Sequence, residues 1–205
     1  MKNEAGVNSK ERILVEATRI AQAHGYNGLN VRDLASAVGI KAASVYHHFA
    51  SKADLGAAVA RRYWEDAEAV LRTIEETSAS PLECLRRYPD TFRHALDRDN
   101  RICLCSFLAA ETDDLPEAIR SEVRKFAEIN IAWLQRMLVD QAAIPDKQCA
   151  SRAEAIFAAV AGAQLIARSR SDISVYDQLI RSYFSAGLLP DTNSRLENSP
   201  THPYT

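Results

Sequence analysis

The chain of 205 residues contains little glycine or proline, with seven of each. These two residues form most tight turns and interrupt helices, so their scarcity favours long helices joined by short connections. No apolar run approaches the roughly 20 residues needed to cross a bilayer, and the start MKNEAGVNSKER lacks the apolar core of a signal peptide. The sequence therefore predicts a cytoplasmic protein with no membrane segment.

Cysteine is also sparse, at Cys84, Cys103, Cys105 and Cys149. Their irregular spacing fits neither a disulfide framework nor a zinc site. The sequence also has no nucleophile and base in a catalytic pattern, no supported pair of carboxylates and no glycine-rich phosphate loop. We therefore expect free thiols, no metal, no cofactor and no enzymatic activity.

Charge is unevenly distributed, although its total is only −2. Residues 1–65 hold nine Lys or Arg and six Asp or Glu, a net charge of +3, and the remainder carries −5. A basic N-terminal part on an acidic body is a weak indication of a polyanionic partner.

Apolar periodicity and capping residues predict helices throughout the chain. Ser9 predicts the start of the first helix and Gly25 its end, while Asn30 and Ser51 are typical caps for later ones. The first four predicted helices cover residues 9–25, about 31–38, about 41–48, and a long segment from 52.

The rest of the chain continues the helical pattern. Ser80–Pro81–x–Glu83 is a helix start, Asp113 or Asp114 opens another helix, and the last two helices cover residues 146–169 and 172–186. No sustained alternating run predicts a sheet. We expect an all-α fold of about nine helices, with a helix-turn-helix head (1–55), a helical ligand-binding and dimerisation body (56–189) and a disordered tail (190–205).

Residues 31–52 carry the strongest functional pattern. Two short helices joined by a tight turn at Gly39 are typical of a helix-turn-helix unit, whose second helix enters the DNA major groove. If Val45 faces the core, His48 lies on the same side, whereas Ala43 and His47 point outward. Small outward residues allow the backbone to approach base edges.

The predicted DNA contacts divide into two groups. Phosphate contacts are expected from Ser44, Tyr46, His47 and Lys52. Base contacts are expected from Arg32, Lys41, Ala42 and Ala43. A metal site at His47 and His48 is not expected, because adjacent helical side chains point about 100° apart.

The stretch VRDLASAVGIKAASVYHHFASKADL closely resembles the DNA-binding signature of the tetracycline repressor (TetR) family, above all in its YHHF-x-SK ending. The resemblance covers residues 9 to about 60. It implies a three-helix DNA-binding head, a helical ligand-binding body, a homodimer held by the last two helices, and repression relieved by a small molecule. Many members carry a Lys-Gly pair where this chain has Ala42 and Ala43, so the operator sequence does not follow from the resemblance.

Two hypotheses remain open for the input to the body. Cys103 and Cys105 lie in one predicted helix and point about 200° apart. In the first hypothesis one of these thiols reacts with electrophiles and acts as a sensor. The alternative is that both are buried apolar residues without reactivity. The other hypothesis is a conventional pocket lined by Phe107, Phe126, Trp133 and Trp64. Arg101, Glu111 or Gln164 would then orient a polar group of the ligand.

The last two helices predict a homodimer interface. A stripe of small residues on the first of them includes Ala159, Gly162 and Ala163, and the second presents an apolar face with Ile180, Tyr183 and Phe184. These can form an isologous four-helix interface, or the same pair can pack within one chain. Two-fold symmetry would place the two DNA-contacting helices of the dimer, residues 41–48 of each chain, about 34 Å apart on a near-palindromic operator.

The most consistent function is a one-component repressor. Its expected partners are double-stranded DNA, a second copy of the chain and a small-molecule or electrophilic inducer. A ligand-independent architectural DNA-binding protein is the alternative, and a helical enzyme is a more distant one.

Overall fold

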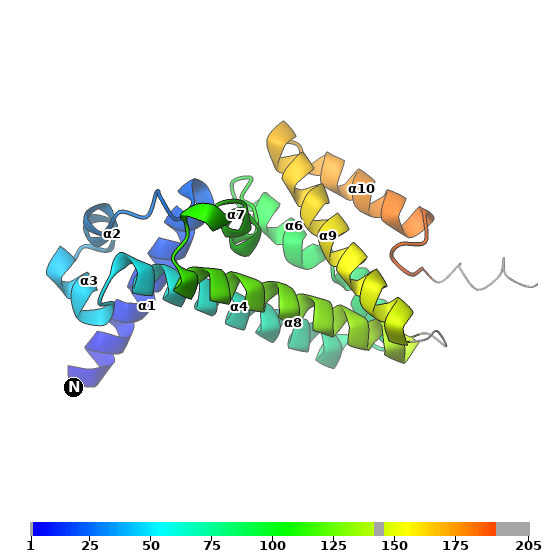
Figure 1. The fold of residues 1–205 in the computed structure, drawn as a ribbon, viewed down its shortest axis with the longest axis horizontal. Helices are drawn as coiled ribbons and strands as arrows, with labels where there is room; N and C mark the ends of the chain where they lie inside the picture. Colours follow the sequence, from blue (N-terminus) through cyan, green and yellow to red (C-terminus); the bar gives the residue numbers. More distant parts are fainter. Residues whose placement is uncertain (1, 142–145, 192–205) are drawn as a thin grey trace, which may run out of the picture.

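The computed structural model describes residues 2–141 and 146–191 and contains ten α-helices, one 3₁₀ turn and no strand within those ranges (Figure 1). The helices are α1 (Lys2–His24), α2 (Val31–Val38), α3 (Ala42–His48), α4 (Lys52–Thr77), α5 (Pro81–Arg87), α6 (Asp90–Asp97), α7 (Leu104–Ala110), α8 (Glu117–Gln141), α9 (Asp146–Arg170) and α10 (Ile173–Ser185), with η1 (Thr112–Asp114) before α8. The all-α prediction is confirmed. Residues 192–205 of the predicted tail lie outside the described residues.

Helices α1, α2 and α3 lie together at one end of the elongated chain (Figure 1). Local caps fix their ends as the sequence predicts: the Asn30 side chain accepts hydrogen bonds from the N–H groups of Arg32 (2.8 Å) and Asp33 (3.3 Å). Gly39 ends α2 in the left-handed conformation, with φ +74°, and the N–H of Ile40 donates back to the Ala35 carbonyl at 2.9 Å. Ser51 caps α4 by accepting from the Asp54 N–H at 3.1 Å.

Three predicted helix starts were wrong. Helix α1 begins at Lys2, so Ser9 lies within the helix and not at its N-terminal cap. Asp113 and Asp114 form the 3₁₀ turn, and α8 starts only after Pro116, a residue that is well tolerated at a helix start. Helix α7 begins at Leu104, so Cys103 is its N-terminal cap and does not share a helix with Cys105.

The body is built around α8, which packs against α4 on one side and α9 on another, with α10 against α9. In Figure 1 the long helices α4 and α8 run alongside each other, and α9 crosses them with α10 beside it. Helix α9 buries the apolar residues Ala153, Ile156, Val160, Ala163 and Ala167, which recur at helical spacing. These residues pack α9 against α8, α10 and α6.

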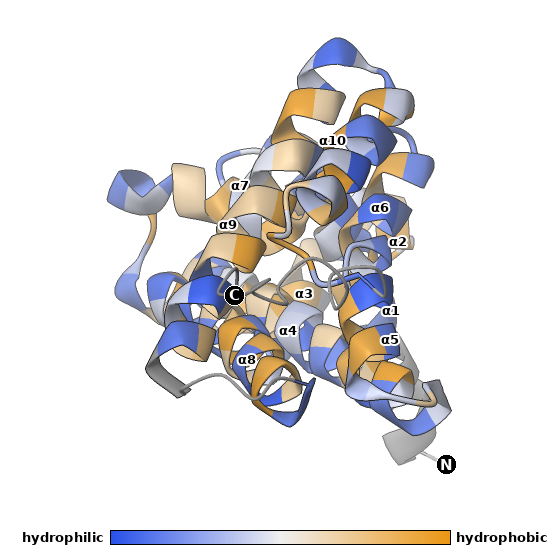
Figure 2. Ribbon diagram, turned by 90° about the vertical axis from the view of Figure 1, so that its right-hand side faces the viewer, coloured by the Kyte–Doolittle hydropathy of each residue, from blue (hydrophilic) through white to orange (hydrophobic). Residues whose placement is uncertain are grey.

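Helix α9 is also long and apolar enough, over Gln148–Arg170, to cross a membrane by length and composition alone. Its apolar run is nevertheless interrupted by Arg152, Glu154 and Arg168, so the prediction that no uninterrupted apolar run approaches 20 residues holds. In Figure 2 the ribbon of α9 is mostly pale to orange, the colours of weakly polar and apolar residues. A helix that is apolar on several sides needs partners on several sides.

Helix α4 joins two apolar clusters. Near its start, Leu55, Val59 and Ala60 are buried with the head residues, and further along Leu71 and Ile74 are buried in the body. The head cluster also includes Leu104 and Leu108 of α7 and Ile119 of α8. The predicted boundary between residues 55 and 56 thus falls inside a continuous helix.

The left-handed conformation of Gly39 allows the effect of a substitution on stability to be predicted. A Cβ at Gly39 would meet no atom within 4 Å, so Gly39→Ala adds only the strain of a left-handed backbone. We expect a loss of about 1 to 2 kcal/mol in the free energy of unfolding by urea. Ser36→Ala, an exposed change within α2, should alter it by less than about 0.5 kcal/mol. An unchanged stability in Gly39→Ala would contradict this account.

Candidate functional site

Helix α3 is held by one deeply buried side chain and leaves its opposite side open. Val45 is 1% exposed, whereas Tyr46 is 52% exposed. Ala43 and His47 are exposed, and His48 is half-buried, as the helical geometry predicts. The surface of α3 around Ala43, Tyr46 and His47 is therefore free to contact a large partner.

The other residues predicted to contact DNA differ in their exposure and in the contacts they already make. Arg32 and Lys41 are exposed, while Ala42 and Ser44 are half-buried. Lys52 is engaged with its own chain: its Nζ lies 4.5 Å from the centre of the Tyr26 ring and 3.5 Å from the carbonyl oxygen of Asn27. Lys52 would have to share its ammonium group between this loop and a phosphate.

Two arginines fix the head helices to one another. The Arg12 guanidinium on α1 donates to the carbonyl of Val38, the last residue of α2. On α4, Arg62 pairs with Glu11 of α1 at 2.5 Å and with Asp66 at 2.9 Å. These contacts position α2, and with it α3, relative to α1 and α4.

Glu111, at the end of α7, connects the body to the head. Its carboxylate accepts a hydrogen bond from the Tyr26 N–H at 2.8 Å. Gly25, with φ +68°, makes room for this group, since a Cβ there would lie 2.1 Å from Glu111 Oε1. The proposed role of Glu111 as a ligand-orienting group was wrong, because its carboxylate is used at the end of α1.

A cavity of about 430 Å³ lies between the head and the body. Its walls come from α1, α4, α6, α8 and the loop before α7: Thr18, Gln22, Tyr63, Asp66, Ala67, Val70, Leu71, Thr91, Phe92, His94, Ala95, Arg98, Arg101, Cys103, Phe126 and Asn130. A cleft beside it, lined by residues of α1, α4 and the same loop, shares Thr18, Gln22, Asp66, Arg98 and Arg101 with it.

The structure brings three of the predicted input residues to this cavity, namely Phe126, Arg101 and Cys103. Trp133 instead stacks on Tyr88 in the core, with ring centres 5.7 Å apart. The guanidinium carbon of Arg168 lies 5.5 Å from the centre of the Phe107 ring. These two aromatic residues and Cys105 are therefore not cavity-lining residues.

The predicted polar and aromatic partners Gln164 and Trp64 also lie elsewhere. Gln164 is fully buried between α6 and the loop before α7. The Trp64 Nε1–H donates to Glu122 at 2.7 Å, linking α4 to α8.

Sequence reasoning missed most of the cavity wall, including Tyr63, Phe92 and Asn130. Asn130 is 2% exposed, accepts a hydrogen bond from the Tyr88 hydroxyl at 3.1 Å and donates to the Phe126 carbonyl at 2.8 Å. A polar residue in the apolar run around Ile129 and Ile131 was the available signal, because buried amides are usually committed to specific partners.

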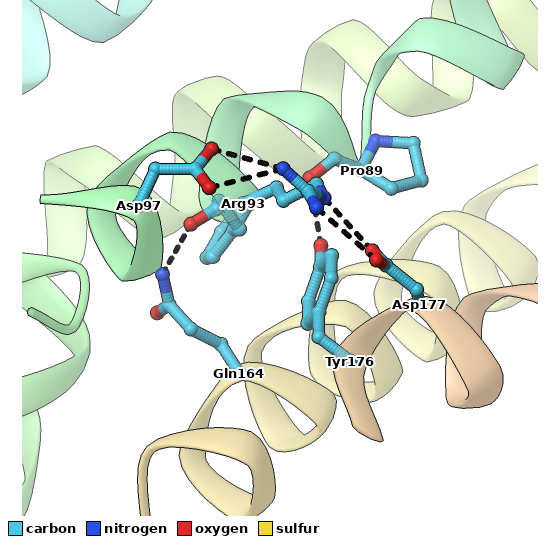
Figure 3. Close-up of polar contacts among 7 residues, drawn as sticks. Pro89, Arg93, Asp97, Gln164, Tyr176 and Asp177 are labelled. Atoms are coloured by element: carbon cyan, nitrogen blue, oxygen red, sulfur yellow. Dashed lines mark hydrogen bonds and ion pairs between the residues drawn. The ribbon is translucent and has the colours of Figure 1, made fainter. Parts of the chain in front are cut away.

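Helix α6, one wall of the cavity, is fastened to α9 and α10 by polar contacts (Figure 3). The Gln164 Nε2 donates to the carbonyl of Phe92, and its Oε1 accepts from the Cys103 N–H at 2.9 Å. The Tyr176 hydroxyl donates to the Pro89 carbonyl at 2.7 Å.

Arg93 completes this attachment by bridging Asp97 of its own helix and Asp177 of α10, with closest distances of 2.9 and 2.8 Å. Figure 3 shows its guanidinium between the two carboxylates. The hydrogen bond from Arg93 lowers the pKa of Asp177, because the guanidinium group stabilises the charged carboxylate.

All four cysteines are buried free thiols. Burial raises the pKa of Cys103 and, more strongly, that of Cys105, which disfavours the reactive thiolate. Among the residues that the structure describes, no group of three or more His, Cys, Asp or Glu side chains is placed to hold a metal ion.

The last two helices present apolar side chains to the outside. On α9, Leu165 is 57% exposed and Ile166 is 42% exposed. Ala159, Gly162, Ile180, Tyr183 and Phe184 are half-buried. The placement of Ala163 at a dimer interface was wrong, because Ala163 is completely buried in the core of its own chain.

Comparison with known proteins identifies relatives of the whole fold. The family model described as "Bacterial regulatory proteins, tetR family" matches residues 13–59. A TetR transcriptional regulator from Legionella pneumophila is 31% identical, with a TM-score of 0.81 over 86% of this chain and 96% of that one. A TetR-family regulator from Agrobacterium tumefaciens is 30% identical, with the same TM-score over 88% and 98%.

A curated relative matches the head region only. The HTH-type transcriptional repressor AcnR of Corynebacterium efficiens is 41% identical over 70 residues, which is 34% of this chain and 36% of that protein. The chain thus spans about a third of the length of this relative.

The buried amide of Gln164 makes a second stability prediction. Gln164→Leu would leave the Cys103 N–H and the Phe92 carbonyl without their partner, and we expect a loss of about 2 to 5 kcal/mol in the free energy of unfolding by urea. Gln148→Leu makes the same change at an exposed position of α9 and should have little effect. Equal stability of the two variants would rule out a structural role for this amide.

Proposed function

Because the chain belongs to the TetR family of transcriptional regulators, we propose that it is a homodimeric repressor that binds a near-palindromic operator and is released by a small molecule. It is a DNA-binding regulator and not an enzyme. The observation that carries the proposal is the open surface of α3, supported from behind by Val45 and joined to α2 through Gly39. We expect the protein to act in the cytoplasm, where its DNA target is accessible.

The exposed residues of α3 and its neighbours would divide the work of DNA recognition. The hydroxyl of Tyr46 and the imidazole of His47 can donate to phosphate oxygens, as can Ser44 and Lys52. Lys41, Ala42 and Ala43 begin α3, the part of a recognition helix that contacts base edges, and Arg32 lies on α2. Methyl groups at Ala42 and Ala43 suit contact with a thymine methyl.

The exposed apolar residues of α9 and α10 support a two-fold interface. Leu165 and Ile166 stand on the outside of α9, and Gly162 has no atom within 4 Å of the position of a Cβ, so a second α9 can approach there. The half-buried Ile180, Tyr183 and Phe184 of α10 would extend the contact. This interface would explain why a helix as apolar as α9 occurs at the surface of a single chain.

The position of the cavity supports control by a ligand. Its wall includes Thr18 and Gln22 of the head helix α1 and Tyr63 of α4, the helix that runs on into the body. A ligand that fits the cavity in only one arrangement of α1 and α4 would favour that arrangement. If the two α3 helices of a dimer then no longer match successive major grooves, the operator is released.

A covalent input at Cys103 or Cys105 remains a hypothesis. Cys103 borders the cavity, where an electrophile could reach it, but the raised pKa values of both thiols favour a non-covalent ligand. Release of DNA by a thiol reagent, abolished by Cys103→Ser, would establish the covalent alternative.

The test is binding of the purified full-length protein to DNA from upstream of its own gene, at fixed salt, with shuffled DNA of equal length as competitor. Fixed salt is needed because phosphate contacts make affinity strongly salt-dependent. We expect a preference for the specific site of about 1,000-fold or more. Equal affinity for both DNAs would favour an architectural DNA-binding protein instead.

In the same assay Tyr46→Phe, which removes only the hydroxyl group, should lower the affinity for the specific DNA and for the shuffled DNA by a similar factor of about 3 to 10. The reason is that a phosphate contact carries no sequence information. A loss confined to the specific site would mean that Tyr46 reads a base.

A charge on the outer face of α9 should separate the dimer. Leu165→Lys places an ammonium group at the proposed interface, and we expect a monomer in sedimentation experiments and a loss of operator affinity of at least about 100-fold. Val139→Lys puts the same charge on an exposed apolar position of α8 and should leave both unchanged. A Leu165→Lys protein that remains a dimer would place the interface elsewhere.

A further inference from the structure

The inner part of the cavity is lined by aromatic rings. Phe126 lies 5.8 Å from Tyr63 and 6.4 Å from Phe92, measured between ring centres, and Leu71 completes the apolar wall. Aromatic pockets of this size bury the apolar body of a small organic molecule. A simple inorganic anion would leave this part of the cavity unfilled.

The outer part of the cavity carries two arginines whose guanidinium groups have no partner among the described residues. Arg98 and Arg101 line both the cavity and the adjoining cleft. Within the described part of the chain, neither guanidinium group forms an ion pair or a side-chain hydrogen bond. Their donors are therefore available to a ligand.

The neighbouring charges of the cleft are mostly balanced within the protein. Arg62 is shared between Asp66, at 2.9 Å, and Glu11, at 2.5 Å, and Arg19 pairs with Glu16 at 2.6 Å. Asp99 is exposed and lines the cleft beside the two arginines, but it is not part of the cavity wall. Among the charged residues of the cavity wall, Arg98 and Arg101 are the cations whose guanidinium groups have no carboxylate partner within the described residues.

The loop that presents these arginines is fixed before any ligand arrives. Asp99 and Asn100 adopt left-handed conformations, with φ values of 58° and 53°. The Asn100 side chain donates to the Arg168 carbonyl at 3.1 Å, and Gln22 of α1 donates to the Ile102 carbonyl at 3.4 Å. A preorganised loop lowers the entropy lost when an anion binds.

One further donor lies at the inner end. The Nδ2 of Asn130 uses one hydrogen for the Phe126 carbonyl, while its oxygen accepts from Tyr88. The second Nδ2 hydrogen has no acceptor among the residues described, although Asn130 borders the cavity. An oxygen at the far end of a ligand would satisfy it.

We propose that this cavity binds an organic acid with an apolar body: a carboxylate or similar anionic group held by Arg101 and Arg98, and an aliphatic or aromatic body against Tyr63, Phe92 and Phe126. The proposal rests on the regulatory function only for its effect on DNA. Binding itself is measured on the protein alone.

The experiment uses isothermal titration of the full-length protein, without DNA and at fixed ionic strength. The probes are straight-chain and phenyl-substituted alkanoic acids of increasing length, each compared with its primary amide and its primary amine. We expect at least one acid to bind about tenfold or more tightly than its amide, because charge-assisted hydrogen bonds to guanidinium groups are lost in the amide. The amine should bind more weakly still.

Two variants assign the acid preference to its residues. Arg101→Gln should bring the acid to within about threefold of its amide, and Arg98→Gln, at a more exposed position, should reduce the preference in part. Arg72→Gln, an exposed change on α4 outside the cavity wall, should leave it unchanged. An unchanged thermal unfolding profile shows that each variant is folded.

The proposal is overturned if no acid exceeds its amide, or if the preference survives in both the Arg101→Gln and the Arg98→Gln proteins. Acid binding that leaves operator affinity unchanged supports the ligand class and counts against induction. If the protein binds the acid but binds no DNA site specifically, the result supports the ligand class and counts against the proposal that the protein is a repressor. The two proposals therefore fail separately.

Discussion

The shared use of helix α4 by two apolar clusters is the constraint on which the rest of the structure depends. Its first turns bury Leu55 and Val59 with the head, and its later turns bury Leu71 and Ile74 with the body. Because the helix is continuous, neither part can shift without moving the other or bending it. The cavity lies alongside this helix and is also lined by α1, so the proposed ligand would contact both the head and the helix that joins it to the body.

The head could be predicted from the sequence because its signals are local. Asn30, Gly39 and Ser51 each act within a few residues of their own position, and helical geometry alone places Val45 inside and Tyr46 outside. The start of α1 was missed because Ser9 is a good cap that also fits inside a helix. A capping residue permits a helix to begin but does not compel it to do so.

The cavity could not be predicted because it depends on contacts between residues far apart in the chain. Glu111, Gln164 and Trp133 had the right chemistry for a ligand site, yet each is committed to a partner more than 40 residues away. The loop before α7 is a second reason: Asp99 and Asn100 are not glycines, so their left-handed conformation carries little signal in the sequence. Phe126 and Arg101 were found because aromatic and cationic groups are general features of ligand sites.

The single deep anchor of α3 has a consequence for how such a regulator can change over generations. Val45 carries the packing of this short helix, while the exposed positions proposed to contact DNA, such as Ala43 and His47, contribute little to the core. Substitutions at those positions are nearly free of a folding cost. The DNA sequence that the helix contacts can therefore change over generations, after gene duplication for example, while the fold is inherited intact.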